Sequence, residues 1–176
     1  MLILMDKKKI KVIFVCHGNI CRSPAAEGTL KKLIRDRGLE NLIEVDSAGT
    51  SSYHVGEKPH TYTRKAAEEY NITLDHIARQ FQPQDFDRFD IIFAMDHYNY
   101  EDILRLAKTQ EHRKKVHLFR EFDPLIKDKN QIPDVPDPYY GGYSGFQEVQ
   151  KIVLRTAENI LNYLVELLDK THNLKN

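Results

Sequence analysis

The order of apolar and polar positions along the chain predicts an alternation of strands and helices. Residues 12–15 read VIFV, a continuous apolar run typical of a strand buried on both faces of a parallel sheet. The next apolar positions recur at helical spacing, which predicts a helix with Ser23 as its N-cap, Pro24 as its first residue and Gly38 at its end. The first strand and the first helix are therefore joined by a short loop.

The same alternation continues to the end of the chain. Further strands are predicted at residues 42–46, 90–94 and 116–119, and further helices after Pro59 (with Tyr62, Ala66 and Tyr70 on one face), over about 96–108 and over about 144–169. This order predicts a single α/β domain over residues 1–176, with its core at about 10–170, in which a doubly wound parallel sheet has helices on both faces. Sites in such sheets lie at the carboxyl ends of the strands, at a topological switch point.

Composition narrows the class of protein. The 176 residues include 26 basic and 26 acidic side chains, so no overall field attracts nucleic acid or an anionic membrane, and we expect neither as a partner. The first five residues are apolar and precede a lysine run, the reverse of a secretory signal, and no stretch is long enough to span a bilayer. Two cysteines are too few for a disulfide framework and favour a reducing, cytoplasmic setting.

Both cysteines fall in the loop at residues 16–23, whose sequence is CHGNICRS. Because this loop enters a helix, its backbone N–H groups and the positive end of the helix dipole converge on one point that suits a dianionic phosphate. The same field stabilises a thiolate, so we expect Cys16 to be ionised and nucleophilic. Arg22 adds a planar guanidinium that holds two phosphate oxygens at once.

Other residues complete this chemistry. Gly18 permits close backbone approach, and Asn19 tolerates a left-handed conformation. The Ser23 hydroxyl is expected to donate to the Cys16 sulfur when a phosphocysteine is hydrolysed. Asp137, between two prolines in a stiff loop at 121–143, is the best-placed proton donor for the leaving oxygen. The scheme requires no metal or other cofactor, and the eight histidines show no clear metal-ligand spacing.

Five motifs occur in a recognisable order, namely CHGNICRS at 16–23, DSAGT at 46–50, ARQ at 78–80, MD at 95–96 and DPYYG at 137–141. With its Cys-x5-Arg-Ser signature, the chain resembles the low-molecular-weight protein tyrosine phosphatases from about Lys11 to the last helix. The resemblance implies a three-layer α/β/α fold with a central four-stranded parallel sheet. It also implies that Cys16 is the nucleophile, Arg22 the phosphate clamp, and Asp137 the general acid and then the general base.

The resemblance assigns supporting roles as well. It implies that Asn19 holds the loop through a polar network with Ser23, Ser47 and His76, and it adds Asp96 as a structural support. Tyr53, Tyr139 and Tyr140 are expected to wall the pocket mouth, unless the last two only pack their own loop. Aromatic walls make a deep slot for a phenol ring, which favours tyrosine-phosphorylated proteins as substrates.

Inorganic phosphate and other oxyanions are expected to bind the same loop, whose remaining members are His17, Ile20 and Cys21. At position 17 an apolar or small residue is common in the family, so we expect His17 to tune substrate choice or pH response. Cys21 either packs beneath the loop or condenses with an oxidised Cys16 into a reversible disulfide.

Three other functions compete with phosphotyrosine hydrolysis. In a phosphoarginine phosphatase a threonine is expected in place of Ile20. A thiol-dependent arsenate reductase of the same fold needs a cysteine outside the 16–23 loop, and the chain has none. A non-catalytic phosphate-binding module would need neither Cys16 nor Asp137.

Overall fold

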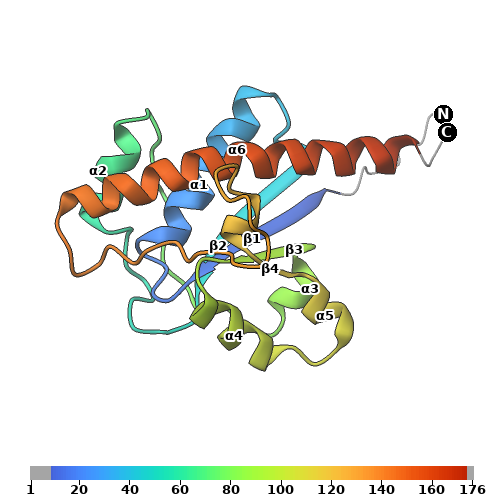
Figure 1. The fold of residues 1–176 in the computed structure, drawn as a ribbon, viewed down its shortest axis with the longest axis horizontal. Coiled ribbons are helices and arrows are strands. Elements are labelled where there is room, and N and C mark those ends of the chain that lie inside the picture. The colour runs from blue at the N-terminus through green and yellow to red at the C-terminus, as the bar shows by residue number, and fades with distance from the viewer. Residues whose placement is uncertain (1–8, 174–176) are drawn as a thin grey trace.

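The computed structural model describes residues 9–173 (Figure 1). They contain a four-stranded parallel sheet in the order β2-β1-β3-β4. Its strands are β1 (Ile10–Cys16), β2 (Ile43–Gly49), β3 (Ile91–Ala94) and β4 (Val116–Leu118). The expected three-layer α/β/α architecture, with a doubly wound four-stranded parallel sheet, is confirmed.

Helices cover both faces of the sheet (Figure 1). One face carries α1 (Arg22–Asp36), α2 (Thr61–Glu68) and α6 (Tyr143–Asn173), and the other carries α3 (Asp85–Arg88), α4 (His97–Leu106) and α5 (Gln110–Lys114). A 3₁₀ helix, η1 (Phe119–Phe122), follows β4. No helix within residues 9–173 is both long enough and apolar enough to cross a membrane.

Strand β1 separates two hydrophobic cores. Val12 and Phe14 pack into the core that α1 and α6 complete, whereas Ile13 and Val15 pack into the core formed with α3 and α4. All four side chains are fully buried. Because successive side chains of a strand point to opposite faces, burial on both faces requires the continuous apolar run seen in the sequence.

The topology places the end of β1 at a switch point. After β1 the chain runs through α1 to β2, which pairs with one edge of β1, and β3 pairs with the other edge of β1. The two connections diverge at the carboxyl end of β1, which leaves a crevice there. Cys16, the last residue of β1, stands at this crevice.

The predicted start of the first helix is wrong. Helix α1 begins at Arg22, and Cys21 occupies the N-cap position without a side-chain cap. Ser23 lies inside the first turn, where its hydroxyl lies 3.0 Å from the Cys16 sulfur instead of capping the helix. Pro24 is accommodated because amides in the first turn have no intrahelical acceptor. The predicted end is confirmed, since Gly38 has φ +66° just after the helix.

Other boundaries differ for local reasons. Strand β2 runs on to Gly49, because its residues stay paired with β1 as far as Cys16. Tyr70 lies outside α2, in a turn that is closed by Asn71 with φ +60°. Phe119 starts η1 rather than ending β4.

The short helices α3 and α5 were not predicted, because segments of four and five residues are too short to show a helical period.

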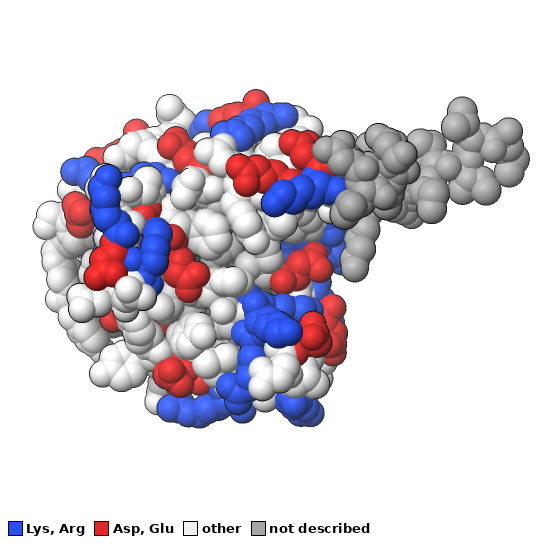
Figure 2. Space-filling view, turned by 45° about the vertical axis from the view of Figure 1, so that its right-hand side comes forward, with Lys and Arg blue, Asp and Glu red and all other residues white. Residues whose placement is uncertain are grey.

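The distribution of charged side chains on the surface is consistent with the formal net charge of zero. In the face drawn in Figure 2, basic and acidic side chains are interspersed.

Candidate active site

The 16–23 loop is fixed to the end of the sheet by its own backbone. Thr50 N donates to the Cys16 carbonyl at 2.9 Å and Ser51 N donates to the His17 carbonyl at 3.0 Å. Gly49 lies directly behind the loop, where an added Cβ would be 2.7 Å from the His17 carbonyl oxygen. The loop therefore rests on the end of β2, and only a glycine at position 49 allows this approach.

Asn19 organises the interior of the loop. It adopts the left-handed conformation expected for it, with φ +58°. Its Nδ2 donates to the hydroxyls of Ser23 at 2.8 Å and Ser47 at 3.0 Å. Its Oδ1 accepts from Arg79 N at 3.0 Å and lies 2.7 Å from Nε2 of His76. The predicted network residues thus meet at one buried amide.

A second layer of polar groups supports this network. The Glu27 carboxylate accepts from the Ser47 hydroxyl at 2.8 Å, and its Oε1 lies 3.0 Å from Nδ1 of His76. Burial raises the pKa of Glu27, but the bonds from His76 and the Lys31 charge outweigh it, and the net pKa is lowered. The Asn19 amide is therefore oriented by a buried carboxylate that stays ionised.

Among the described residues one group has the spacing to hold a metal ion. It consists of Glu27, Asp46 and His76, whose possible ligand atoms lie within 4.8 Å of one another. The cations Lys31 and Arg79 already pair with the two carboxylates. This neutralisation reduces their attraction for a metal ion. The three side chains are better explained as a hydrogen-bonded support for the loop.

Cys16 lies at the bottom of the site with 2% of its surface exposed. Its Sγ is 3.0 Å from the Ser23 hydroxyl, which itself accepts from Asn19. Cys21 packs among buried residues of α2 and α6, including Ala66 and Phe146. Burial, followed by the neighbouring Cys16, raises the pKa of Cys21 to about 12. The two thiols of the loop therefore sit in opposite environments, one beside hydroxyl and arginine and one in an apolar cluster.

Arg22 makes both of its hydrogen bonds through one nitrogen. Its Nη1 donates to Asp96 Oδ2 at 2.7 Å and to the Val135 carbonyl at 3.0 Å, while its Nη2 lies 3.7 Å from Asp137 Oδ2. Burial opposes its charge, but Cys16 and Asp96 raise the pKa of Arg22 above its ordinary value. Among the described residues, both groups that accept a hydrogen bond from Arg22 accept it from Nη1. The N–H groups of Nε and Nη2 are therefore available to an oxyanion.

The loop that carries Asp137 is anchored at two places. Near its start, the fully buried Asp123 accepts from Arg120 Nε at 3.0 Å and from Arg155 Nε at 2.9 Å. Shortly before Asp137, Val135 N donates to the Met95 carbonyl at 2.8 Å. Asp137 then accepts from the Tyr139 amide at 3.1 Å, which closes a local turn. This side chain is half exposed and borders the same hollow as Cys16.

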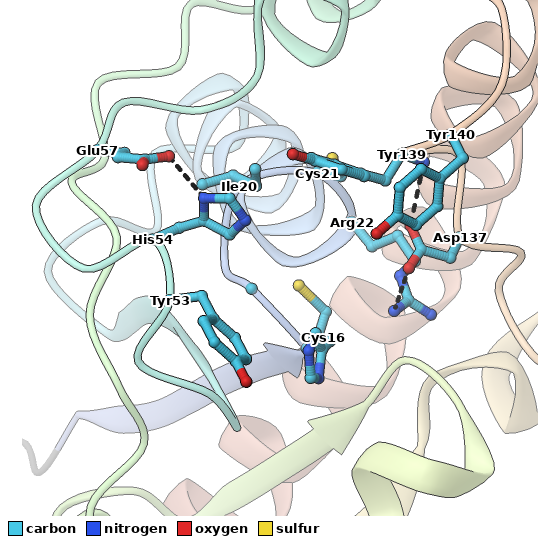
Figure 3. Close-up of a pocket in the computed structure, with 12 residues that line it drawn as sticks. Cys16, Ile20, Cys21, Arg22, Tyr53, His54, Glu57, Asp137, Tyr139 and Tyr140 are labelled. Carbon is cyan, nitrogen blue, oxygen red and sulfur yellow. Dashed lines mark hydrogen bonds and ion pairs between the residues drawn. The ribbon is translucent and has the colours of Figure 1, made fainter.

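Cys16, Arg22 and Asp137 line one cavity of about 480 Å³. Figure 3 shows Tyr53 and His54 on one side of it, Tyr139 and Tyr140 on the other, and Cys16 between them. Tyr139 and Tyr140 meet edge to face, with ring centroids 4.8 Å apart. The floor thus carries sulfur and guanidinium, and the walls are aromatic.

The structure brings the predicted residues together around this cavity or beneath it. The cavity lining also includes His54 and Glu57, which the sequence reasoning missed. Their spacing of three residues next to the predicted wall residue Tyr53 is a weak signal, since such a pair is common on any exposed turn.

The comparison with known families agrees with this geometry. The family model described as low molecular weight phosphotyrosine protein phosphatase matches residues 11–173. The chain belongs to this family. Among the members of this phosphatase family, the low molecular weight protein-tyrosine-phosphatase of Streptomyces coelicolor is 42% identical over 151 residues, which cover 86% of this chain and 91% of that protein.

Solved structures agree as well. The protein tyrosine phosphatase of Entamoeba histolytica, solved with Hepes in the active site, is 40% identical with a TM-score of 0.83, covering 90% of this chain and 98% of that one. A Drosophila arginine phosphatase is 34% identical with a TM-score of 0.79, covering 88% of this chain and 98% of its own. Two phosphatases that are named for different substrates, tyrosine and arginine, are therefore similar to this chain in fold.

Proposed function

We propose that this chain hydrolyses phosphotyrosine in proteins through a phosphocysteine intermediate. The observation that carries the proposal is that Cys16 and Arg22 of the 16–23 loop and Asp137 of a distant loop border one cavity with tyrosine walls. A sulfur nucleophile, a phosphate clamp and a proton donor are the groups that displacement at phosphorus needs.

In the first step the Cys16 thiolate attacks phosphorus. A sulfur–phosphorus bond forms as the bond from phosphorus to the phenol oxygen breaks, and the protonated carboxyl of Asp137 gives its proton to that oxygen. Arg22 binds two of the phosphoryl oxygens through Nε and Nη2, while Asp96 and the Val135 carbonyl fix its Nη1 side. A clamp that is already oriented needs no rearrangement as charge develops.

In the second step water releases the phosphate. The Asp137 carboxylate accepts a proton from the attacking water, an oxygen–phosphorus bond forms, and the sulfur leaves as a thiolate. The Ser23 hydroxyl, 3.0 Å from Sγ and oriented by Asn19, stabilises the leaving sulfur by donating to it.

The walls favour a phosphorylated phenol over the alternatives. A tyrosine ring stacks between aromatic side chains while its phosphate reaches the floor, whereas phosphoserine is too short to use such walls. Ile20 borders the cavity with an apolar side chain, which offers no acceptor for the N–H groups of a phosphoarginine. Both cysteines are free thiols, and the cytoplasmic setting that we propose keeps them reduced.

The test uses p-nitrophenyl phosphate, phenyl phosphate and a phosphotyrosine peptide. Cys16→Ser should abolish turnover, and Arg22→Lys, which keeps charge but removes the fork, should lower kcat/KM about 10²-fold or more. Asp137→Asn should slow phenyl phosphate by about 10²-fold or more and p-nitrophenyl phosphate less, because nitrophenolate leaves without a proton.

Asp134→Asn is the matched control, since Asp134 is an exposed carboxylate of the same loop. It should keep near wild-type rates. Turnover retained in Cys16→Ser with the fold intact would refute the mechanism. Equal or faster hydrolysis of a phosphoarginine peptide would move the chain to the other substrate class, and absence of turnover with tight phosphopeptide binding would make it a binding module.

A further inference from the structure

The cavity carries an unbalanced set of charges. Of its 12 lining residues, Arg22 alone has a permanent positive charge, and it is already paired with Asp96 beneath the floor. The acidic groups that border the cavity are the Cys16 thiol and the carboxyls of Glu57 and Asp137. A dianionic phosphoryl group that enters adds two further negative charges. The loop amides and Arg22 offset part of this repulsion, but no second permanently charged cation lines the cavity.

His54 is placed to supply a compensating charge. Its Nδ1 lies 2.7 Å from the Glu57 carboxylate, and its side chain is only 25% exposed. The opposite edge of the ring lies over the 16–23 loop, because a Cβ added to Gly18 would be 2.9 Å from His54 Cδ2 and 3.7 Å from its Nε2. Figure 3 shows this ring between Glu57 and the interior of the cavity. Glu57 fixes the ring so that Nε2 is left for an anion.

His17 lies on the same rim. It follows the nucleophile directly, its side chain is exposed, and its ring centroid is 6.3 Å from that of Tyr53. Within residues 9–173 no carboxylate forms an ion pair with the His17 ring. The His17 ring is therefore free of a fixed anionic partner among these residues and is accessible to an anion in the cavity.

We propose that His17 and His54 are anion-binding residues of the rim, which take up protons as a dianionic phosphoryl group enters the cavity. The proposal rests on the proposed function, because it assumes that a phosphate monoester is the anion. An imidazole titrates near neutral pH, so a modest field converts it to imidazolium. Binding coupled to proton uptake should favour dianionic monoesters over monoanionic ligands of similar shape.

Other titratable or charged groups line the same cavity. The Cys16 thiolate and the Asp137 and Glu57 carboxylates can compete for the proton, whereas the Arg22 guanidinium is already protonated and repels further positive charge. Cys21 and the three tyrosines, Tyr53, Tyr139 and Tyr140, complete the titratable lining. A proton taken up by Cys16 or Asp137 would give the same calorimetric signal. The experiment therefore has to remove each histidine and the thiol separately.

The probe is sulfate, a tetrahedral dianion that does not titrate in the range used. Calorimetry of sulfate binding at pH 7, in two buffers with different ionisation enthalpies and at equal ionic strength, gives the number of protons taken up. Wild type should take up on the order of one proton, with smaller values in His17→Gln and His54→Gln and almost none in the double variant. At pH 6 the double variant should bind sulfate about tenfold more weakly, and above pH 8.5 its affinity should approach that of wild type.

His97→Gln, an exposed histidine outside the cavity, is the matched control and should behave as wild type. Cys16→Ser should keep the uptake. Unchanged uptake in the double variant, or uptake lost in Cys16→Ser alone, overturns the proposal. Histidine C2-proton NMR of wild type gives a second measurement, in which two resonances should move toward imidazolium positions when sulfate is added at pH 7. Sulfate binding needs no turnover, so these outcomes are separate from a failure of the proposed phosphatase activity.

Discussion

One carboxylate joins the phosphate clamp to a helix: Asp96 accepts from Arg22 Nη1 on Oδ2 at 2.7 Å and from the Asn99 amide on Oδ1 at 2.7 Å. Asp96 is the N-cap of α4, so the same side chain fixes both the guanidinium and the start of that helix. The position of Arg22 is therefore tied to the packing of the opposite layer.

Asp96→Asn should separate these two roles. Asparagine caps a helix as well as aspartate does, but it leaves the buried Arg22 without its ionic partner. We expect kcat/KM to fall about 10²-fold and the free energy of unfolding to fall by about 3 kcal/mol. Asp96→Ala should lose about 1 kcal/mol more, because the cap is also removed. Steady-state kinetics and urea unfolding measure both, and equal stability of the two variants would contradict the capping role.

Gly49→Ala should displace the 16–23 loop. The new methyl group would meet the His17 carbonyl oxygen at 2.7 Å and the Asn19 amide nitrogen at 3.1 Å, both backbone atoms that cannot rotate away. A displacement on the order of 1 Å at the nucleophile costs about 10²-fold in rate. Gly142→Ala is the control, because an added Cβ there meets nothing within 4 Å. Kinetics with p-nitrophenyl phosphate should show a large loss for the first variant and little for the second.

Cys21 should resist alkylation in the folded protein. Burial, and then the proximity of Cys16, raises the pKa of Cys21 to about 12, so almost none of it is thiolate at pH 8. Iodoacetamide treatment of a Cys16→Ser variant, followed by mass spectrometry, should therefore label Cys21 slowly in buffer and rapidly in concentrated urea. Fast labelling of the folded variant would mean that Cys21 is exposed and ionised.

Glu27 should make stability depend on pH in the acid range. Although burial raises the pKa of Glu27, the bonds from His76 and Lys31 lower it on balance below its ordinary 4.5. A depressed pKa in the folded state gives a stabilisation that is fully present above about pH 4.5 and is lost as pH falls through the lower folded-state value. The stability difference between wild type and Glu27→Gln, measured by urea unfolding, should be constant from pH 5 to 7 and shrink below pH 4.5. A difference that grows toward low pH would contradict this assignment.

The fold was predictable because its signals are local and periodic. The run at residues 12–15 requires burial on both faces, and the Cys-x5-Arg-Ser motif requires a loop that enters a helix. The start of α1 was misjudged at Ser23 because a serine before a proline is a common cap, and sequence does not reveal that its hydroxyl contacts Cys16 instead. The catalytic role of Asp137 relied on resemblance, since an aspartate between prolines is otherwise only a turn former.

The pair of His54 and Glu57 was missed for a different reason. Neither residue belongs to a motif, and although the pair is local, its position over the cavity depends on how the segment after β2 folds back over the 16–23 loop. Long-range placement of this kind leaves no periodic trace in a sequence. It becomes visible only when the cavity and its lining are in view.

The two anchors of the segment that bears Asp137 have an evolutionary consequence. Asp123 is clamped by arginines from η1 and α6, and Val135 is bonded to the end of β3. Between these fixed points residues 127–131 are exposed on the surface. Insertions and deletions in that stretch should therefore be tolerated without altering where the proton donor stands, which makes it a natural site for variable surface features beside a constant chemistry.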